Sequence, residues 1–193
     1  MARASNLNMA NLLTLSRILL LPLFVLLSLY AYRSPPSSSS QLYHLLAIIA
    51  FFAIITSDLL DGQFARRRGQ VTALGALLDP LADKLFVTTS FVLLAAFGRL
   101  PAWLATLVVS KDLLTLFGWG ALFILNRNTT VNPSRLGKLC AVFQYATICA
   151  ILLQLPAELN RWFFWPVTAV LTATSFVGYA IEVIEGANHR GAR

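Results

Sequence analysis

Long apolar runs constrain this chain more than any other feature. Of its 193 residues, 58% are hydrophobic and 12% are charged, and the mean hydropathy is +0.72. A membrane-spanning helix needs about 20 mostly apolar residues, and six such runs are present, at 11–32, 43–65, 71–97, 102–125, 137–155 and 162–184. We therefore predict an all-α integral membrane protein with six transmembrane helices and an N-terminal interfacial segment at 1–10. Residues 1–193 should form a single transmembrane domain.

Short polar segments separate these runs. They comprise a Pro/Ser loop at 33–42, a tight basic loop at 66–70, turns at 98–101 and 156–161, and a polar loop at 126–136. The first run also follows Arg3, as a signal peptide would. However, it is long, and it has no clear small-residue cleavage site.

The net charge is +7 and reflects membrane topology better than nucleic-acid binding, because the basic residues lie between apolar runs. With six spans, ten basic residues would lie on the side of the termini: Arg3, Arg17, Arg66, Arg67, Arg68, Arg127, Arg135, Lys138, Arg190 and Arg193. Three basic residues would lie on the other side: Arg33, Arg99 and Arg161. Cytoplasmic loops carry such an excess of Lys and Arg. We therefore predict cytoplasmic termini and a bacterial inner membrane, with an organelle membrane as the alternative.

Four carboxylates interrupt the second and third runs. Asp58, Asp61, Asp79 and Asp83 are half of the eight acidic residues in the chain, and each costs about 2.5–3.5 kcal/mol within a bilayer. The first two are three residues apart and the last two are four apart, so each pair shares a helix face. Both pairs lie at similar distances from the hairpin centre near Gly69. We expect the four side chains to converge in a pocket open to the cytoplasm.

Clustered carboxylates repel one another unless some are protonated or a cation lies between them. A ligand set made only of oxygen favours Mg²⁺ or Mn²⁺, and two such ions suit phosphoryl chemistry. Gly62, Ala65 and Gly75 fall on or beside the acidic face. Their small size leaves room for a flat base or, as the alternative, for tight helix packing. Arg66 could meet phosphate oxygens at the cytoplasmic end, or it could serve topology alone.

The full pattern is Asp58-x2-Asp61-Gly62-x2-Ala65-Arg66-x8-Gly75-x3-Asp79-x3-Asp83. It resembles the signature of the CDP-alcohol phosphotransferase family at every specified position. The resemblance implies that all four aspartates bind two divalent metal ions and that Asp83 is also the catalytic general base. It further implies a CDP-diacylglycerol substrate, release of CMP, and a cytidine site lined by Gly62, Ala65 and Gly75 with Arg66 close by.

The segment Asn11-x2-Thr14-x2-Arg17 is similar to the pattern of the family's first helix, which helps to hold the nucleotide. Ala10 stands where the family commonly has proline. Taken alone, Asn11 could be a helix cap and Thr14 an ordinary residue of the span.

The acceptor is suggested by the segment from Pro133 to Lys138 and by Gln144, which resemble the branch of the family that uses glycerol-based acceptors. Lys111, Arg135 and Lys138 are candidates to bind an acceptor phosphate. The alternatives are a local Lys111–Asp112 ion pair and topology charges for the other two.

We predict transfer to glycerol 3-phosphate, giving phosphatidylglycerophosphate, by a homodimer. Cardiolipin synthesis from phosphatidylglycerol and transfer to inositol phosphate remain open as alternatives. A cation transporter, a different class of protein, fits the glycines and Arg66 less well.

Overall fold

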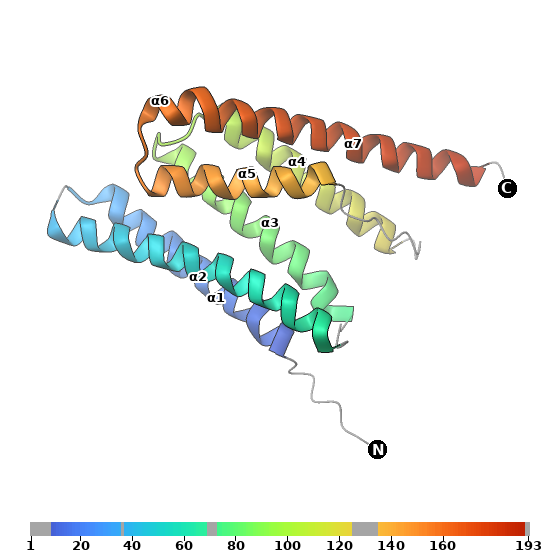
Figure 1. The fold of residues 1–193 in the computed structure, drawn as a ribbon, viewed down its shortest axis with the longest axis horizontal. Coiled ribbons are helices and arrows are strands. Elements are labelled where there is room, and N and C mark those ends of the chain that lie inside the picture. The colour runs from blue at the N-terminus through green and yellow to red at the C-terminus, as the bar shows by residue number, and fades with distance from the viewer. Residues whose placement is uncertain (1–8, 36, 69–72, 125–134, 192–193) are drawn as a thin grey trace, which may run out of the picture. The chain divides into compact units, whose positions relative to one another are not determined.

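The computed structural model describes the backbone of residues 9–35, 37–68, 73–124 and 135–191, and the side chains of residues 19–35, 37–57, 81–118 and 135–181. Within these ranges the chain is helical and contains no strand. The helices are α1 (Met9–Arg33), α2 (Ser38–Arg68), α3 (Ala73–Ala96), α4 (Ala102–Ile124), α5 (Arg135–Leu152), α6 (Ala157–Leu159), a π-helical turn η1 (Asn160–Phe164) and α7 (Trp165–Gly191) (Figure 1).

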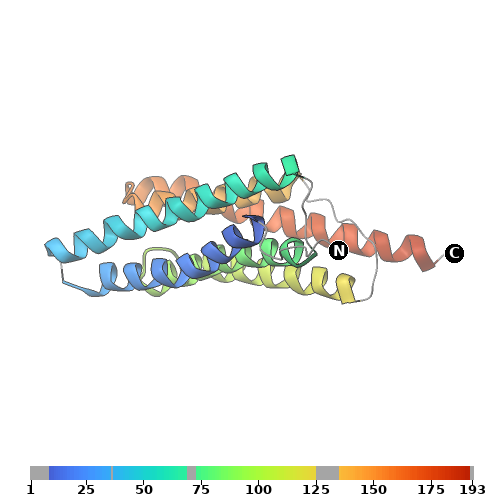
Figure 2. The ribbon, with the colours of Figure 1, turned by 90° about the horizontal axis from the view of Figure 1, so that it is seen from below.

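The chain divides into two compact units, Met1–Thr89 and Ser90–Arg193. In the first unit α1 and α2 lie side by side and antiparallel, as both ribbon views show (Figure 1, Figure 2). Helix α2 begins earlier than the predicted Pro/Ser loop allowed. The cause is a reciprocal cap, in which the Ser40 amide donates to Oγ of Ser37 at 3.3 Å and the Ser37 amide donates to Oγ of Ser40 at 3.0 Å. These bonds satisfy amides that a helix start leaves without partners.

Three phenylalanines form the centre of the first unit. Phe24 of α1, Phe51 of α2 and Phe86 of α3 are buried, and their ring centroids are 6.4 Å (Phe24–Phe51), 5.4 Å (Phe24–Phe86) and 5.9 Å (Phe51–Phe86) apart. Such distances are typical of favourable aromatic pairs. Ala47 and Ala50 are buried on the same stretch of α2 as Phe51. Small side chains of this kind let helix backbones approach closely. The three helices of this unit are therefore held in a defined register.

The turns of the second unit follow helix-ending chemistry. After α3, Gly98 has a positive φ of 66°, its amide donates to the Ala95 carbonyl and the Arg99 amide donates to the Leu94 carbonyl, both at 2.9 Å. This is the Schellman motif, in which glycine is the preferred residue. After α5 the same pattern recurs with Gln154 at φ 53°.

The prediction of a turn at 156–161 was wrong, because the chain already reverses before it. The α5 helix ends at Leu152, the chain turns at the Schellman motif around Gln154, and helix resumes at Ala157. Nδ2 of Asn160 donates to the Leu155 carbonyl at 3.1 Å. That bond satisfies a carbonyl group left free by the turn, so no longer loop is required.

Within the second unit α7 packs against both α4 and α5. Polar side chains lie along the α5–α7 contact: Oγ1 of Thr147 is 2.7 Å from Oγ1 of Thr168, and Sγ of Cys140 is 3.6 Å from Oγ1 of Thr172. All four residues are buried. Polar contacts of this kind help hold helices together in a bilayer, where lipid provides no hydrophobic driving force between them.

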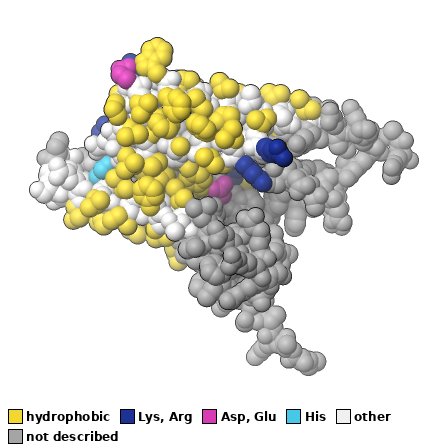
Figure 3. All heavy atoms as spheres, in the orientation of Figure 1, with side chains coloured by type: hydrophobic (Ala, Val, Ile, Leu, Met, Phe, Trp, Pro, Cys, Tyr) yellow, Lys and Arg dark blue, Asp and Glu magenta, His cyan; other side chains and the backbone are white. Residues whose placement is uncertain are grey.

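The surface is that of a helical membrane protein. Three described segments are long and apolar enough to cross a bilayer, namely Ser38–Ser57, Arg135–Leu152 and Ala157–Ile181. Large hydrophobic side chains such as Leu19, Phe117 and Val142 are exposed, and hydrophobic side chains cover much of the described surface on the face in Figure 3. The predicted all-α fold with membrane-type helices is confirmed for the described residues.

Candidate active site

The four predicted metal ligands lie on two consecutive helices. Asp58 and Asp61 belong to α2, whereas Asp79 and Asp83 belong to α3. Of the four, only Asp83 has a described side chain, and it is half-buried. Among the described side chains, no three His, Cys, Asp or Glu residues lie close enough together to hold a metal ion. The side chains of Asp58, Asp61 and Asp79 are not among those described.

The contact between Phe51 and Phe86 defines the register of these helices. Position 58 follows Phe51 by seven residues, and position 79 precedes Phe86 by seven residues. Seven residues are about two turns of an α-helix, so each position lies on the same helix face as its phenylalanine. Since α2 and α3 are consecutive helices that run in opposite directions (Figure 1, Figure 2), both steps run toward the connection between them. Position 58 on α2 and position 79 on α3 are therefore each about 10 Å along their helix from the Phe51–Phe86 contact.

The residues predicted to bind the CDP-lipid belong to the same unit. Asn11 and Thr14 lie in the first turns of α1, Gly62, Ala65 and Arg66 lie near the end of α2, and Gly75 lies near the start of α3. Their side chains are outside the described set. Since α1 packs on α2 in antiparallel fashion, the start of α1 lies beside the end of α2. These positions therefore lie at one end of the first unit.

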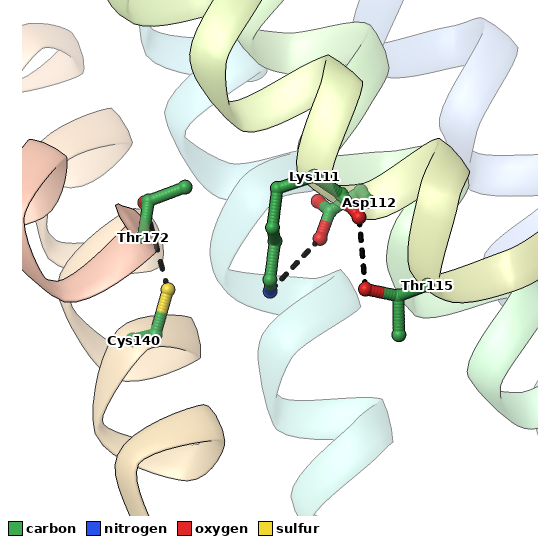
Figure 4. Close-up of polar contacts among 5 residues, drawn as sticks. All are labelled: Lys111, Asp112, Thr115, Cys140 and Thr172. Carbon is green, nitrogen blue, oxygen red and sulfur yellow. Dashed lines mark hydrogen bonds and ion pairs between the residues drawn. The ribbon is translucent and has the colours of Figure 1, made fainter. Parts of the chain in front are cut away.

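Lys111 and Asp112 form a buried ion pair on α4 (Figure 4). Nζ of Lys111 lies 3.1 Å from Oδ1 of Asp112, and the side chains are 7% and 1% exposed. The Thr115 hydroxyl donates to the Lys111 carbonyl at 2.8 Å one turn further on. The expectation that an intramembrane lysine needs a partner is met by its sequence neighbour. A buried charge without such a partner would be strongly destabilising.

The other two predicted acceptor ligands, Arg135 and Lys138, are exposed in the first turn of α5. No contact among the described residues joins either of them to Lys111. The three basic residues are therefore on two helices of the second unit, one of them buried and paired and two of them facing outward.

The sequence indicated Gln144 as a marker of the acceptor branch without a role of its own, and the structure places it on the inner face of α5. Gln144 lies there between Cys140 and Thr147 and is 1% exposed. Its Nε2 atom has no hydrogen-bond partner among the described residues. The sequence does show a polar residue within an apolar run, but it does not show whether that residue is satisfied.

The fold and these positions define a class of protein: a helical protein with membrane-type helices that carries four aspartates on two consecutive helices. The sequence profile of the CDP-alcohol phosphatidyltransferase family matches residues 7–175. The chain therefore belongs to the CDP-alcohol phosphatidyltransferase family, and it is a phosphatidyltransferase enzyme of phospholipid biosynthesis.

Its relatives include the CDP-diacylglycerol–glycerol-3-phosphate 3-phosphatidyltransferase of Bacillus subtilis (strain 168), 34% identical over 159 residues that cover 79% of this chain and 80% of the relative. The protein of the same name from Pectobacterium atrosepticum is 35% identical over 151 residues, 75% of this chain and 76% of the relative. The CMP-forming cardiolipin synthase of Streptomyces coelicolor is 34% identical over 116 residues, 60% of this chain and 52% of the relative.

Proposed function

We propose that this protein transfers the phosphatidyl group of CDP-diacylglycerol to glycerol 3-phosphate, giving phosphatidylglycerophosphate and CMP. The observation that carries this proposal is the Phe51–Phe86 contact at 5.9 Å. It supports a hairpin in which positions 58 and 79 lie at about the same level, two turns from that contact. The names of the Bacillus and Pectobacterium relatives support the same acceptor.

The residues present suit divalent metal ions. Asp58, Asp61, Asp79 and Asp83 offer only carboxylate oxygens, which are the donors that Mg²⁺ and Mn²⁺ prefer. The proposal assigns two such ions to the four aspartates. When bound, they would neutralise charge on the phosphates of the CDP-lipid. Their positive charge would also explain why four acidic residues persist on helices of this polarity.

Asp83 is proposed as the general base. Its carboxylate takes the proton of the acceptor hydroxyl, whose oxygen forms a bond to the β-phosphorus of CDP-diacylglycerol. The bond between that phosphorus and the oxygen bridging to the α-phosphate breaks, and CMP leaves with the electron pair. The half-buried side chain of Asp83 supports this role, since it is both sheltered and accessible.

The remaining binding roles follow the helices. Asn11 and Thr14 on α1, with Gly62, Ala65, Arg66 and Gly75 on the α2–α3 hairpin, are proposed to hold the cytidine and phosphates of the CDP-lipid. Lys111, Arg135 and Lys138 are proposed to attract the phosphate of the acceptor. For Lys111 this requires the phosphate to compete with the carboxylate of Asp112, its partner at 3.1 Å.

The proposal includes the membrane arrangement. We assign six spans to α1 to α5 and to the α6–η1–α7 run, within a single domain. The termini and the aspartates would face the cytoplasm of a bacterial inner membrane. The active form would be a homodimer, and cross-linking in intact membranes should trap this dimer. The excess of basic residues flanking α2 and α5 supports this orientation.

The test is release of CMP from CDP-diacylglycerol by the full-length protein in detergent with Mg²⁺ or Mn²⁺. Glycerol 3-phosphate, phosphatidylglycerol and inositol phosphate are supplied singly as acceptors. We expect CMP with glycerol 3-phosphate and none after chelation of the metal. No CMP with any acceptor would reject the proposed reaction, and CMP with phosphatidylglycerol alone would reject the acceptor in favour of cardiolipin synthesis.

Asp83→Asn tests the proposed base. The amide cannot accept the proton, so turnover should fall by about 10²–10⁴-fold while CDP-diacylglycerol still binds. A matched control is Glu158→Gln, which neutralises an exposed carboxylate next to Arg161 and should leave turnover unchanged. Near-normal turnover in Asp83→Asn would show that another group takes the proton.

A further inference from the structure

Helix α1 contains a proline in its interior. Pro22 lies midway along the helix and is exposed, as is Leu19 one turn earlier on the same face. A proline inside a helix donates no backbone hydrogen bond, and its ring collides with the carbonyl group four residues earlier, here that of Ile18. Sharp bends in helices occur at such positions. Pro22 therefore divides α1 into two segments, 9–21 and 22–33.

The direction of the bend depends on the face on which Pro22 lies. The collision opens the helix on the proline side, so the preceding segment tilts toward the opposite side. Phe24 follows Pro22 by two residues, or about 200° around the helix, and so lies on that opposite side. There it is fully buried against Phe51 of α2 and Phe86 of α3. Segment 9–21 therefore tilts toward the side of α1 on which α2 and α3 lie, while Phe24 holds the rest of α1 in place.

The tilted segment lies level with the acidic end of α2. Because α1 and α2 are antiparallel, each residue back along α1 from the Phe24–Phe51 contact corresponds to one residue forward along α2. Position 14, ten residues before Phe24, is therefore level with position 61, ten residues after Phe51. The contact between Tyr30 and Tyr43, with ring centroids 5.3 Å apart, gives the same register within two residues.

The tilt is large enough to decide whether a group on α1 reaches a ligand held at the end of α2. Thr14 precedes Pro22 by eight residues, or about 12 Å of helix. A bend of about 20° at Pro22 displaces the backbone at Thr14 sideways by about 4 Å. A hydrogen bond does not survive a displacement of that size. A straight α1 would therefore hold Thr14, and Asn11 one turn before it, further from the end of α2.

We propose that Pro22 is a positioning residue for the CDP-lipid, because its bend brings the first turns of α1, with Asn11 and Thr14, to the end of α2. Pro22 touches no substrate and acts through those two residues. The inference rests on the proposed CDP-lipid site, to which Asn11 and Thr14 are assigned. An exposed residue without a polar group thus determines how tightly the CDP-lipid is held.

The experiment uses the full-length protein in detergent with Mg²⁺. It measures KM for each substrate, thermal unfolding, and the rise in unfolding temperature that CDP-diacylglycerol alone causes. Pro22→Ala restores the backbone bond to the Ile18 carbonyl and straightens α1. KM for CDP-diacylglycerol should rise by about tenfold, and the ligand-induced rise in unfolding temperature should shrink. KM for glycerol 3-phosphate should not change, and the unfolding temperature without ligand should hold or rise, because the helix is no longer interrupted.

A second variant keeps the composition and changes only the direction of the bend. Leu23 is also exposed, so Pro22→Leu combined with Leu23→Pro moves the ring by one residue to a position with room for it. One residue turns the bend by about 100° around the helix axis, away from α2. KM for CDP-diacylglycerol should rise at least as much as in Pro22→Ala, although a proline is still present.

Pro166→Ala is the matched control. Pro166 is an exposed proline within the helical run of the second unit, so its replacement should leave KM for CDP-diacylglycerol unchanged. An unchanged KM for CDP-diacylglycerol in both Pro22 variants, or an equal rise in KM for both substrates, would overturn the inference and assign Pro22 a structural role. If CDP-diacylglycerol fails to raise the unfolding temperature of the parent protein itself, the proposed CDP-lipid site is rejected and this role of Pro22 with it.

Discussion

The Lys111–Asp112 pair provides a quantitative test of how charge is tolerated inside this protein. The side chains are 7% and 1% exposed, and their charged atoms are 3.1 Å apart. Removing either member takes the opposite charge away from the one that stays buried, at a cost of about 3–5 kcal/mol. Replacing both by apolar residues of similar volume removes that cost. Lys111→Met and Asp112→Leu should thus each destabilise the protein strongly, whereas the double variant should recover most of the loss.

The assay is thermal unfolding in detergent across the four proteins of this double-mutant cycle. For a chain of this length, 1 kcal/mol corresponds to about 2–4 °C, so each single variant should unfold about 6–20 °C below the parent. The double variant should unfold within about 4 °C of it. If the double variant instead loses the sum of the two single losses, the residues are not coupled, and the pair does not explain how Lys111 is buried.

The same cycle separates stability from function. The recovered double variant lacks the ammonium that is proposed to attract the acceptor phosphate. Its KM for glycerol 3-phosphate should therefore stay raised although its unfolding temperature returns. A double variant that is both stable and normal in KM would remove Lys111 from the acceptor site and leave the ion-pair argument intact.

Two further perturbations test the framework of the fold. Phe86→Ala removes the ring that contacts Phe24 and Phe51, and it should lower the free energy of unfolding by about 3–5 kcal/mol. It should also lower metal-dependent CMP release more than Phe86→Leu does. Equal turnover in both variants would show that this contact does not position the aspartates. Gly98 has a φ of 66° and open space where a Cβ would lie, so Gly98→Ala should destabilise the protein by about 1–2 kcal/mol through backbone strain alone. Gln154 has a φ of 53°, so Gln154→Gly should stabilise the protein by up to about 1 kcal/mol. Thermal unfolding of both variants checks these opposite signs.

Apolar runs predicted the helices well because bilayer thickness determines how long an apolar segment must be. The fourth run, predicted at 102–125, is the helix Ala102–Ile124. The ends of the helices were less predictable where side chains form hydrogen bonds with the backbone. Serines at 37–40 suggested a loop, but the Ser37–Ser40 cap starts α2 among them. Composition cannot distinguish serines that cap a helix from serines that form a loop.

The candidate site was predictable in residue type and helix face, but its contacts were not. The spacing of Asp58, Asp61, Asp79 and Asp83 follows from helix geometry alone and needs no structure. The register between α2 and α3 depends on which residues pack, and the Phe51–Phe86 contact supplies it. Any of several phenylalanines in these runs could have made that contact, so the sequence alone leaves the register open.

Polar residues inside membrane helices serve two purposes that only their partners distinguish. Thr147 and Gln144 lie one turn apart on one face of α5 and are equally buried, so neither spacing nor composition separates them. Thr147 bonds to the Phe143 carbonyl at 2.8 Å and to Thr168 at 2.7 Å, and it therefore contributes to helix association. The Gln144 amide has no such bond among the described residues, so burial there lowers stability. Thr147→Val should therefore lower the unfolding temperature, whereas Gln144→Leu should hold or raise it.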